Sequence, residues 1–329
     1  MMDWTDRHCR FFHRQFSKRA LLYTEMVTAP AVLHGERDRL LAHDQLEHPL
    51  ALQLGGSDPS QLAEATRVAC GHGIDEINLN VGCPSDRVQS GTFGAVLMRD
   101  PDVVARCAEA MIVASDGPEI TVKCRIGVDS QVPEEVLPAF LGTVSDAGVQ
   151  RFSIHARKAW LQGLSPKQNR EVPPLDYDRV YRLKAARSDL TIIINGGITT
   201  LKEAHAHLEH VDGVMLGRAA YQKPWLLASV DQEFFGTQAP GRQRDEVLDV
   251  MAQYADAHIA RGGRLNNVTR HMLGLYHGEA GGRLFRRYIA ENVAGRDAAS
   301  GDVLREAGRF VAETRAAMRL RQDNLAAAD

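Results

Sequence analysis

The chain has 329 residues, of which 44% are hydrophobic and 25% are charged. This is the composition of a folded globular protein, and the length suffices for one large domain and a smaller one. The formal net charge of −3 gives no global indication of nucleic-acid binding, so charge has to be judged locally. The five cysteines form no Cys-x-x-Cys pair and are odd in number, which argues against a disulfide framework or a zinc site.

Neither a secretory signal nor an apolar run of about 18 residues occurs. We therefore expect a cytoplasmic protein without a membrane partner. His205, His207 and His210 are close in sequence, but helical geometry points the first two to different sides, so we predict no metal site.

Strand and helix patterns alternate over about 220 residues. Seven segments read as β-strands: Ala20–Val27, Leu50–Gly55, Asp75–Val81, Ile120–Ile126, Arg151–His155, Thr191–Asn195 and Gly213–Leu216. Amphipathic helix patterns lie between several of them, for example at Pro59–Cys70, Pro101–Ala114 and Leu201–Leu208. This alternation predicts a parallel sheet with right-handed crossovers.

An open doubly wound sheet and a closed (β/α)8 barrel both fit this alternation. No Gly-x-Gly-x-x-Gly follows any strand, which weakens the dinucleotide-binding open sheet. Polar residues and glycines follow strand after strand, as expected where every βα loop faces one active site, so we predict an α/β fold of the TIM-barrel type. Because Met1–Asp6 resembles a βα loop with a helix N-cap at Thr5 or Asp6, we expect that the first barrel strand is missing from the given sequence.

The pattern becomes entirely helical towards the C-terminus. Helical periodicity covers Asp245–Ala260, Asn267–Tyr276, Gly282–Val293 and Gly301–Leu320. Residues 241–329 carry 14 arginines, no lysine and 12 acidic residues. We predict a barrel domain over residues 1–235 and an all-helical domain over 241–329, joined through Gly236–Gly241.

The segment Glu76–Pro84 is the first candidate for chemistry. Apolar residues alternate with Asn78 and Asn80 until a Gly-Cys-Pro turn breaks the strand. The turn presents Cys83 just beyond the C-terminal end of the strand, and Ser85, Asp86 and Arg87 follow. Cys83 is thus a candidate proton donor or nucleophile, with a small core residue as the alternative.

Two late strands end in glycine. Gly196 and Gly197 follow one of them, and Gly217 and Arg218 end the next. Neighbouring glycine-ended strands late in a barrel are the usual phosphate site, because backbone N–H groups can approach the anion closely. Tight turns without a ligand are the alternative.

Lys123 lies inside a predicted strand, on the same face as Arg125. A lysine that faces a barrel interior is costly unless it meets an anion or a polar cofactor ring. A Schiff-base lysine and a solvated edge lysine stay open. Gln53, His155 and Asn195 also lie at or near strand ends, so we expect them at the same end of the barrel as Cys83.

The predicted helical domain contains a local excess of positive charge. Between Arg261 and Arg287 there are six arginines and one acid, Glu279, a local charge of about +5. Arg283 and Arg286 share a helix face with Arg287. Such a cluster suits a polyanion backbone, and a solvated helix face is the alternative.

Taken together, eight ordered segments resemble the tRNA-dihydrouridine synthases, and specifically their A subfamily. The segments are Met2–Cys9, Tyr23–Val27, Gln53–Gly56, Asn78–Ser85, Lys123–Gly127, His155–Lys158, Leu164–Arg170 and Asn195–Gly197. The resemblance covers nearly the whole chain. It implies an FMN-bearing barrel and a helical domain that grips tRNA, with NADPH reducing the flavin and the flavin delivering hydride to C6 of a D-loop uridine.

The resemblance also implies a role for individual residues. Cys83 corresponds to the donor that protonates C5 of the uridine from the opposite side. The flavin-contacting positions correspond to Met1, Met2, Gln53, Lys123 and His155, and those at the phosphate end to Asn195, Gly196, Gly197, Gly217 and Arg218. The tRNA-contacting positions correspond to Asn80, Lys167, Arg170, Arg283 and Arg286. The run from Lys167 to Arg170 resembles the segment that orients tRNA for the uridine at position 20, and it leaves position 20a open.

Three rival functions stay open. A flavin barrel that reduces a small ene-type substrate or a free pyrimidine would not need the arginine-rich helices. An aldolase would form a Schiff base on Lys123 and lack a flavin. A non-catalytic RNA-binding protein would have no use for Cys83 beside a flavin-type pocket. We expect a monomer without a metal.

Overall fold

The computed structural model describes residues 1–85, 93–238, 241–293 and 300–326, so the predicted flanking residues Asp86 and Arg87 lie outside the described residues. The chain forms two compact units. The first is Met1–Asp3 with Leu21–Gly217, and the second is Trp4–Ala20 with Arg218–Asp329. The predicted domain limits, 1–235 and 241–329, stay a prediction.

The first unit is built on a parallel sheet of seven strands in sequence order. They are β1 (Leu22–Thr28), β2 (Leu50–Gly55), β3 (Glu76–Val81), β4 (Glu119–Arg125), β5 (Arg151–His155), β6 (Thr191–Asn195) and β7 (Gly213–Met215). All seven predicted strands are confirmed, with their ends within two residues of the predicted ones.

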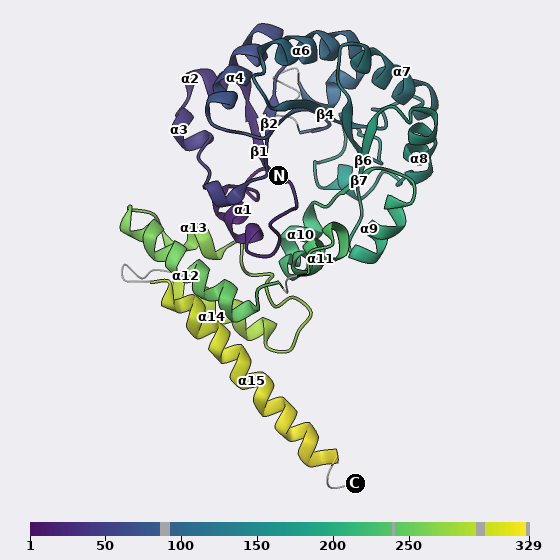
Figure 1. Ribbon diagram of the computed structural model, residues 1–329. Helices are drawn as coiled ribbons and strands as arrows, with labels where there is room; N and C mark the ends of the chain where they lie inside the picture. Colours follow the sequence, from purple (N-terminus) through teal and green to yellow (C-terminus); the bar gives the residue numbers. More distant parts are fainter. Residues whose placement is uncertain (86–92, 239–240, 294–299, 327–329) are drawn as a thin grey trace. The chain divides into compact units, whose positions relative to one another are not determined.

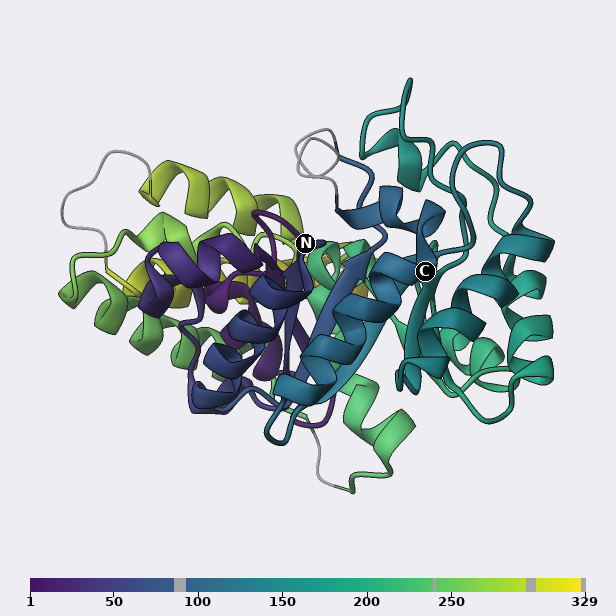
Figure 2. The ribbon, with the colours of Figure 1, turned by 90° about the horizontal axis from the view of Figure 1, so that it is seen from above.

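Helices surround this sheet on its outer side, as Figure 1 shows in a view along the barrel and Figure 2 after a turn of 90°. They are α2 (Ala29–His34), α3 (Arg37–Leu40), α4 (Pro59–Gly71), α6 (Pro101–Ala114), α7 (Pro133–Asp146), α8 (Tyr177–Ala186) and α9 (Leu201–Leu208). Strands curled inside a ring of helices confirm the predicted TIM-barrel type of fold.

The helix starts follow from local sequence. Asp58, Asp100, Asp176 and Thr200 each accept a hydrogen bond from a backbone N–H in the first turn of the helix that they precede. Such caps contribute about 1 kcal/mol each. α4 and α6 also begin with proline, whose fixed φ suits the first helical position. The capped helices then bury their apolar faces against the outward side chains of the strands, such as Leu52, Leu79 and Val122, which are fully buried.

The inner face of the sheet is polar, which is unusual because branched aliphatic residues dominate most barrel interiors. Three contacts skip a strand. Tyr23 on β1 donates to Glu76 on β3 at 2.5 Å, Arg151 on β5 donates to Glu76 at 3.2 Å, and Lys123 on β4 donates to Asn195 on β6 at 3.2 Å. Side chains of non-adjacent strands can meet in this way only on the concave face of a curved sheet.

The second unit is helical. It contains α1 (Arg7–Arg14), α10 (Arg218–Gln222), α11 (Val230–Phe235), α12 (Arg244–Ala260), α13 (Leu265–Thr269), α14 (Gly282–Val293) and α15 (Asp302–Ala326). Asp6 caps α1 as predicted and accepts from the N–H groups of His8 and Cys9. α1 packs against α12, where Phe11 stacks on Tyr254 with 4.0 Å between ring centroids.

One helix prediction is wrong in extent. The predicted helix Asn267–Tyr276 ends at Thr269, and turns follow up to residue 278. Gly274 lies so close to the carbonyl oxygen of Gln222 that a Cβ atom there would be 2.3 Å from it. This close approach to α10 holds the chain in a path that a continuous helix does not follow, and sequence periodicity carries no information on it.

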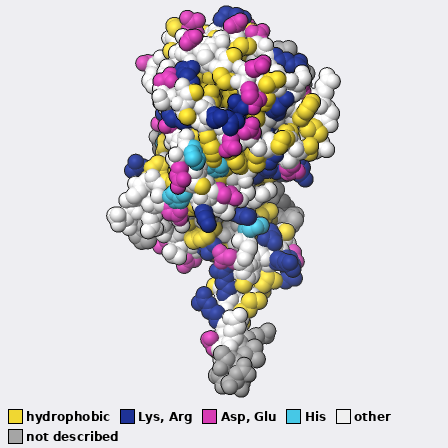
Figure 3. Space-filling model, turned by 90° about the vertical axis from the view of Figure 1, so that its right-hand side faces the viewer, with side chains coloured by type: hydrophobic (Ala, Val, Ile, Leu, Met, Phe, Trp, Pro, Cys, Tyr) yellow, Lys and Arg dark blue, Asp and Glu magenta, His cyan; other side chains and the backbone are white. Residues whose placement is uncertain are grey.

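Charged side chains of both signs are interspersed over the face of the molecule shown in Figure 3, in keeping with the small net charge. Of the helices in the described part of the chain, none has the length and apolar character needed to cross a membrane.

The contacts of Glu76 predict a specific loss of stability. Glu76 is 3% exposed and accepts from Tyr23, Thr121 and Arg151, so Glu76→Ala would leave buried donors without an acceptor. We expect a loss of about 3 kcal/mol in the free energy of unfolding. Glu119 also pairs with Arg151, at 2.8 Å, but its side chain is 41% exposed. Glu119→Ala is therefore the matched control and should cost less than about 1 kcal/mol. Urea unfolding of both variants measures the difference, and equal losses would contradict the assignment.

Candidate functional site

Hydrogen bonds run from Glu76 along the concave face to the turn that carries Cys83. Three amide side chains, called here the amide row, lie between these two points: Gln53, Asn78 and Asn80. Asn78 Nδ2 donates to Thr121 Oγ1 at 2.8 Å, and Thr121 Oγ1 donates to Glu76 at 2.7 Å. All of these side chains are buried. Because buried amides have few alternative partners, their orientations are fixed.

The end of the amide row that is remote from Glu76 holds the Cys83 turn. Gln53 Nε2 donates to Asn78 Oδ1 at 2.9 Å, and Asn80 Nδ2 donates to Gln53 Oε1 at 2.8 Å. Asn80 Oδ1 then accepts from the backbone N–H groups of Gly82, at 3.1 Å, and Cys83, at 2.9 Å. The Asn80 side chain thus serves as the acceptor that a neighbouring strand would otherwise provide for these two N–H groups. The chain bends at this point, just after β3.

Cys83 differs from the packed cysteines of the chain. Cys9, Cys107 and Cys124 are fully buried, and burial raises the pKa of Cys107 and of Cys124 to about 12. The Cys83 side chain is half-buried, and its Sγ lies 3.4 Å from Ser85 Oγ. Cys83 is therefore less buried than these three packed cysteines, and it lies just beyond the C-terminal end of β3.

Lys123, His155 and Asn195 lie on the same concave face beside the Cys83 turn. In the sheet register Lys123 is opposite Asn80, and His155 is opposite Asn195. Burial, followed by the positive charge of Arg125, lowers the pKa of Lys123 from 10.5 to about 8. Burial and the charges of Arg125 and Lys123 also hold the pKa of His155 well below its usual value. A pKa of about 8 keeps Lys123 protonated at lower pH, and the downward shift favours the neutral form of His155.

The double glycine after β6 has a geometry that only glycine adopts easily. Gly196 and Gly197 have φ values of +115° and +72°. A Cβ atom on Gly197 would lie 2.6 Å from Leu175 and 2.9 Å from Tyr177, and one on Gly196 would lie 3.2 Å from the His155 ring. The Tyr177 hydroxyl donates to the Gly196 carbonyl oxygen at 2.6 Å, which fixes the peptide planes of this turn.

Met1 lies beside the other predicted glycine. Its Sδ is 3.6 Å from the position that a Cβ atom on Gly217 would take. Met1 and Met2 are exposed, and the backbone N–H of Asp3 donates to the Glu25 carboxylate on β1. Arg218 begins α10 in the second unit, and its place at the phosphate end stays a prediction.

Arg125 is a site residue that the motif-based assignment missed, although its place on the Lys123 face could have indicated it. Its side chain is 4% exposed. Its guanidinium donates to the carbonyl oxygens of Gly82 at 3.1 Å, Lys158 at 3.1 Å and Asn169 at 3.0 Å. One buried cation thus ties the Cys83 turn to the loop that follows β5.

The residues predicted to contact tRNA lie in different surroundings. Lys167 and Arg170 are exposed at the 3-10 helix Gln168–Arg170, and Arg283 and Arg286 are exposed on α14. Asn80 is 7% exposed, and its amide bonds Gln53 and the Cys83 turn. This gives Asn80 a structural role, and its contact with tRNA stays a prediction.

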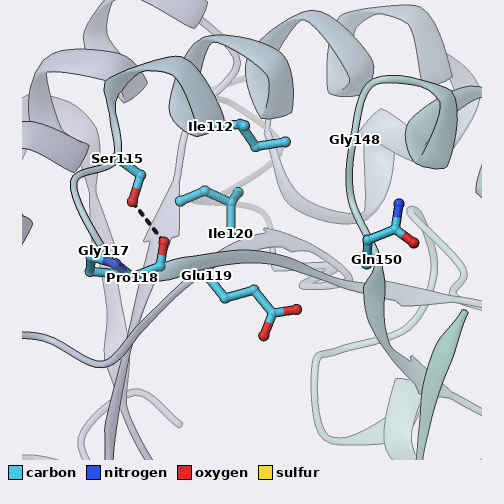
Figure 4. Close-up of a pocket in the computed structure, with 8 residues that line it drawn as sticks. All are labelled: Ile112, Ser115, Gly117, Pro118, Glu119, Ile120, Gly148 and Gln150. Carbon is cyan, nitrogen blue, oxygen red and sulfur yellow. Dashed lines mark hydrogen bonds between the residues drawn. The ribbon is translucent and has the colours of Figure 1, made fainter.

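A cavity of about 270 Å³ lies away from this site. Residues of the segment Ile112–Ile120, with Gly148 and Gln150, line it at the N-terminal ends of β4 and β5, and Ser115 donates to the Pro118 carbonyl oxygen beside it at 2.7 Å (Figure 4). It offers no cluster of convergent polar side chains. In the described residues no group of three His, Cys, Asp or Glu side chains could hold a metal ion.

Comparison with known proteins agrees with the motifs. The sequence model of the family described as "Dihydrouridine synthase (Dus)" matches residues 1–310. The tRNA-dihydrouridine(20/20a) synthase of Vibrio parahaemolyticus is 58% identical over 293 residues, which is 89% of this chain and 89% of the relative. That of Shewanella oneidensis is 58% identical over 292 residues, 89% of this chain and 87% of the relative.

A third relative extends the match towards the C-terminus. The tRNA-dihydrouridine(20/20a) synthase of Escherichia coli K12 is 54% identical over 316 residues, which is 96% of this chain and 91% of the relative. The family resemblance expected from the eight sequence segments is therefore confirmed. The chain belongs to the dihydrouridine synthase family.

Proposed function

We propose that this protein reduces the C5=C6 bond of a uridine in the D-loop of tRNA, at position 20, to 5,6-dihydrouridine, with FMN as cofactor and NADPH as reductant. The observation that carries the proposal is the half-buried Cys83 thiol, held at the strand ends by Asn80 beside Lys123. The family and the names of its relatives support the same reaction. We further propose that it works as a monomer in the cytoplasm.

The residues present fit a flavin mononucleotide on three counts. The Gly196–Gly197 turn directly follows β6 and has positive φ at both residues, a backbone conformation that can direct N–H groups towards an anion. His155 Nδ1 is buried without a hydrogen-bond partner. Lys123 has Asn195 as its acceptor among the described residues, which leaves ammonium protons for a polar ring. We infer that Met1, Met2 and Gln53 complete the ring site, and that Asn195, Gly217 and Arg218 complete the phosphate end.

When bound and reduced, the flavin supplies the hydride that is added at C6 of the uracil ring. Cys83 Sγ donates the proton that completes the addition at C5, and the thiolate left behind is reprotonated before the next turnover. The amide row keeps the Cys83 turn in one orientation, so the thiol is positioned before the substrate arrives. His155 and Lys123 would hold the flavin ring by hydrogen bonds.

A uridine within folded tRNA has to leave its stack to reach this thiol. Backbone contacts supply most of the affinity of such a complex, and the pocket reads the base. We propose Lys167 and Arg170 as the contacts on the barrel unit, and Arg283 and Arg286 on α14. All four side chains are exposed, so phosphate groups of the RNA can reach them.

Replacing the thiol tests the chemistry. Cys83→Ala should keep FMN and tRNA binding and lower dihydrouridine formation by about 10²-fold or more, since only the proton donor is lost. Mass spectrometry of digested tRNA measures the product. Cys70 is another half-buried cysteine, with Ser115 beside it, and Cys70→Ala should leave turnover unchanged. Normal dihydrouridine formation by Cys83→Ala would refute the assignment.

The lowered pKa of Lys123 predicts a pH dependence of FMN affinity. The ammonium is charged below pH 8 and loses its proton as the pH rises through about 8, so the dissociation constant of FMN should increase between pH 7 and 9. Lys123→Met should weaken binding at pH 7 and flatten this increase. Fluorescence titration of the apoprotein measures both, with exposed Lys202→Met as the control. A pH profile of Lys123→Met that equals that of the unaltered protein would contradict the role.

Charge removal on α14 tests the RNA contact. The double variant Arg283→Ala with Arg286→Ala should weaken tRNA binding and reduce the slope of log K against log salt by about 1 to 2, with NADPH oxidation intact. Arg187→Ala, which removes a charge paired with Asp189 at the N-terminal end of β6, is the control. An unchanged salt titration of the double variant would count against the proposed contact.

A further inference from the structure

The loop after β5 presents an exposed indole between two buried residues. Trp160 is 43% exposed, whereas its neighbours Ala159 and Leu161 are 0% and 6% exposed. This alternation is that of an extended segment with one face against the protein, so the indole points outward. A single exposed apolar side chain needs no explanation by itself. Three further features of the described residues set Trp160 apart.

The first feature is the rigidity of its backbone. The buried amide of Asn169 pairs with Trp160 as a strand would, because Oδ1 accepts from the Trp160 N–H at 2.7 Å and Nδ2 donates to its carbonyl oxygen at 2.8 Å. On either side, Ala159 pairs with the backbone of Gly127 and Asp129, and the Leu161 N–H donates to the Asp129 carboxylate at 2.9 Å. The backbone of Trp160 is therefore ordered before a ligand arrives, and stacking of a ligand on the indole costs little backbone entropy of the protein.

The second feature is a direct link to the Cys83 turn. The Arg125 guanidinium that binds the Gly82 carbonyl oxygen also binds those of Lys158 and Asn169. Lys158, which precedes the indole in the chain, and Asn169, which pairs with the Trp160 backbone, are thus both fixed to the turn that carries Cys83. The Cys83 turn follows β3 and the Trp160 loop follows β5, so both lie at the C-terminal end of the strands.

The third feature is local positive charge. Residues 156–175 carry four cations and one acid, Glu171, in a chain whose net charge is −3. The Lys158 ammonium lies 5.7 Å from the centroid of a Trp160 ring, and Lys167 and Arg170 are exposed in the same loop. Proteins that bind unstacked RNA combine an aromatic face for the base with cations for the backbone.

We propose that Trp160 is a stacking platform for a base of the substrate tRNA that neighbours the uridine presented to Cys83. This inference rests on the proposed function, which supplies the RNA. Removing a uridine from the D-loop stack exposes the faces of adjacent bases, and a rigid indole at the edge of the site replaces one lost stacking partner. The platform accepts any base, because every base has a π face.

Three substitutions of Trp160 separate stacking from apolar contact. Trp160→Ala should raise the dissociation constant for an unmodified tRNA transcript about tenfold. Trp160→Phe keeps an aromatic face and should stay within about threefold of the unaltered protein. Trp160→Leu keeps apolar area without a π face and should resemble Trp160→Ala. FMN affinity and NADPH oxidation without tRNA show that each variant is folded, and both should be unchanged.

The salt dependence distinguishes this site from the arginines of α14. Loss of stacking should weaken binding to the same degree at every salt concentration and leave the slope of log K against log salt unchanged. Affinity of Trp160→Ala equal to that of the unaltered protein overturns the proposal, as does equal affinity of Trp160→Leu and Trp160→Phe. If the unaltered protein forms no dihydrouridine in tRNA, the proposed function fails instead, so the two failures can be told apart.

Discussion

The structure depends on one series of hydrogen bonds that all run in the same direction. The series begins at the Cys83 turn and ends on the Glu76 carboxylate. Each amide of the amide row accepts a hydrogen bond from the side of Cys83 and donates one towards Glu76. Aligned bonds of this kind strengthen one another in a buried setting. The carboxylate at one end therefore stabilises the turn at the other, which lies beyond the end of the same strand. The conformation of the Cys83 turn therefore depends on side chains in the barrel interior.

Unneutralised positive charge is the second constraint. Arg125 is buried and bonds three carbonyl oxygens, and among the described residues neither Arg125 nor Lys123 forms an ion pair with a carboxylate. The resulting field favours electron-rich and anionic groups at the open end of the strands. It adds to burial, the larger cause, in lowering the pKa of His155. The same field suits the electron-rich ring and the polyanionic RNA that we propose as ligands.

The sequence predicts the strands well, because short runs dominated by apolar residues, such as Leu50–Gly55 and Thr191–Asn195, have few other interpretations, and both match the structure. Helices with a clear start, such as Pro101–Ala114, match as well. The loop after β5 could not be predicted, because a buried asparagine that pairs with the backbone of Trp160 looks like any polar loop residue in the sequence. The close approach of Gly274 to Gln222 is equally invisible, since it joins positions that are remote along the chain. The place of Cys83 followed from its turn, whereas the way in which Asn80 holds that turn required coordinates.

The single direction of the amide row also constrains how this chain can diverge. An asparagine changed to aspartate at position 80 would keep the acceptor for the turn but lose the donor to Gln53, which would then have to rotate and take its proton away from Asn78. A lone exchange in the series is thus opposed by its neighbours on both sides. We expect related sequences either to keep all of these residues or to change several of them together, and seldom to change one alone.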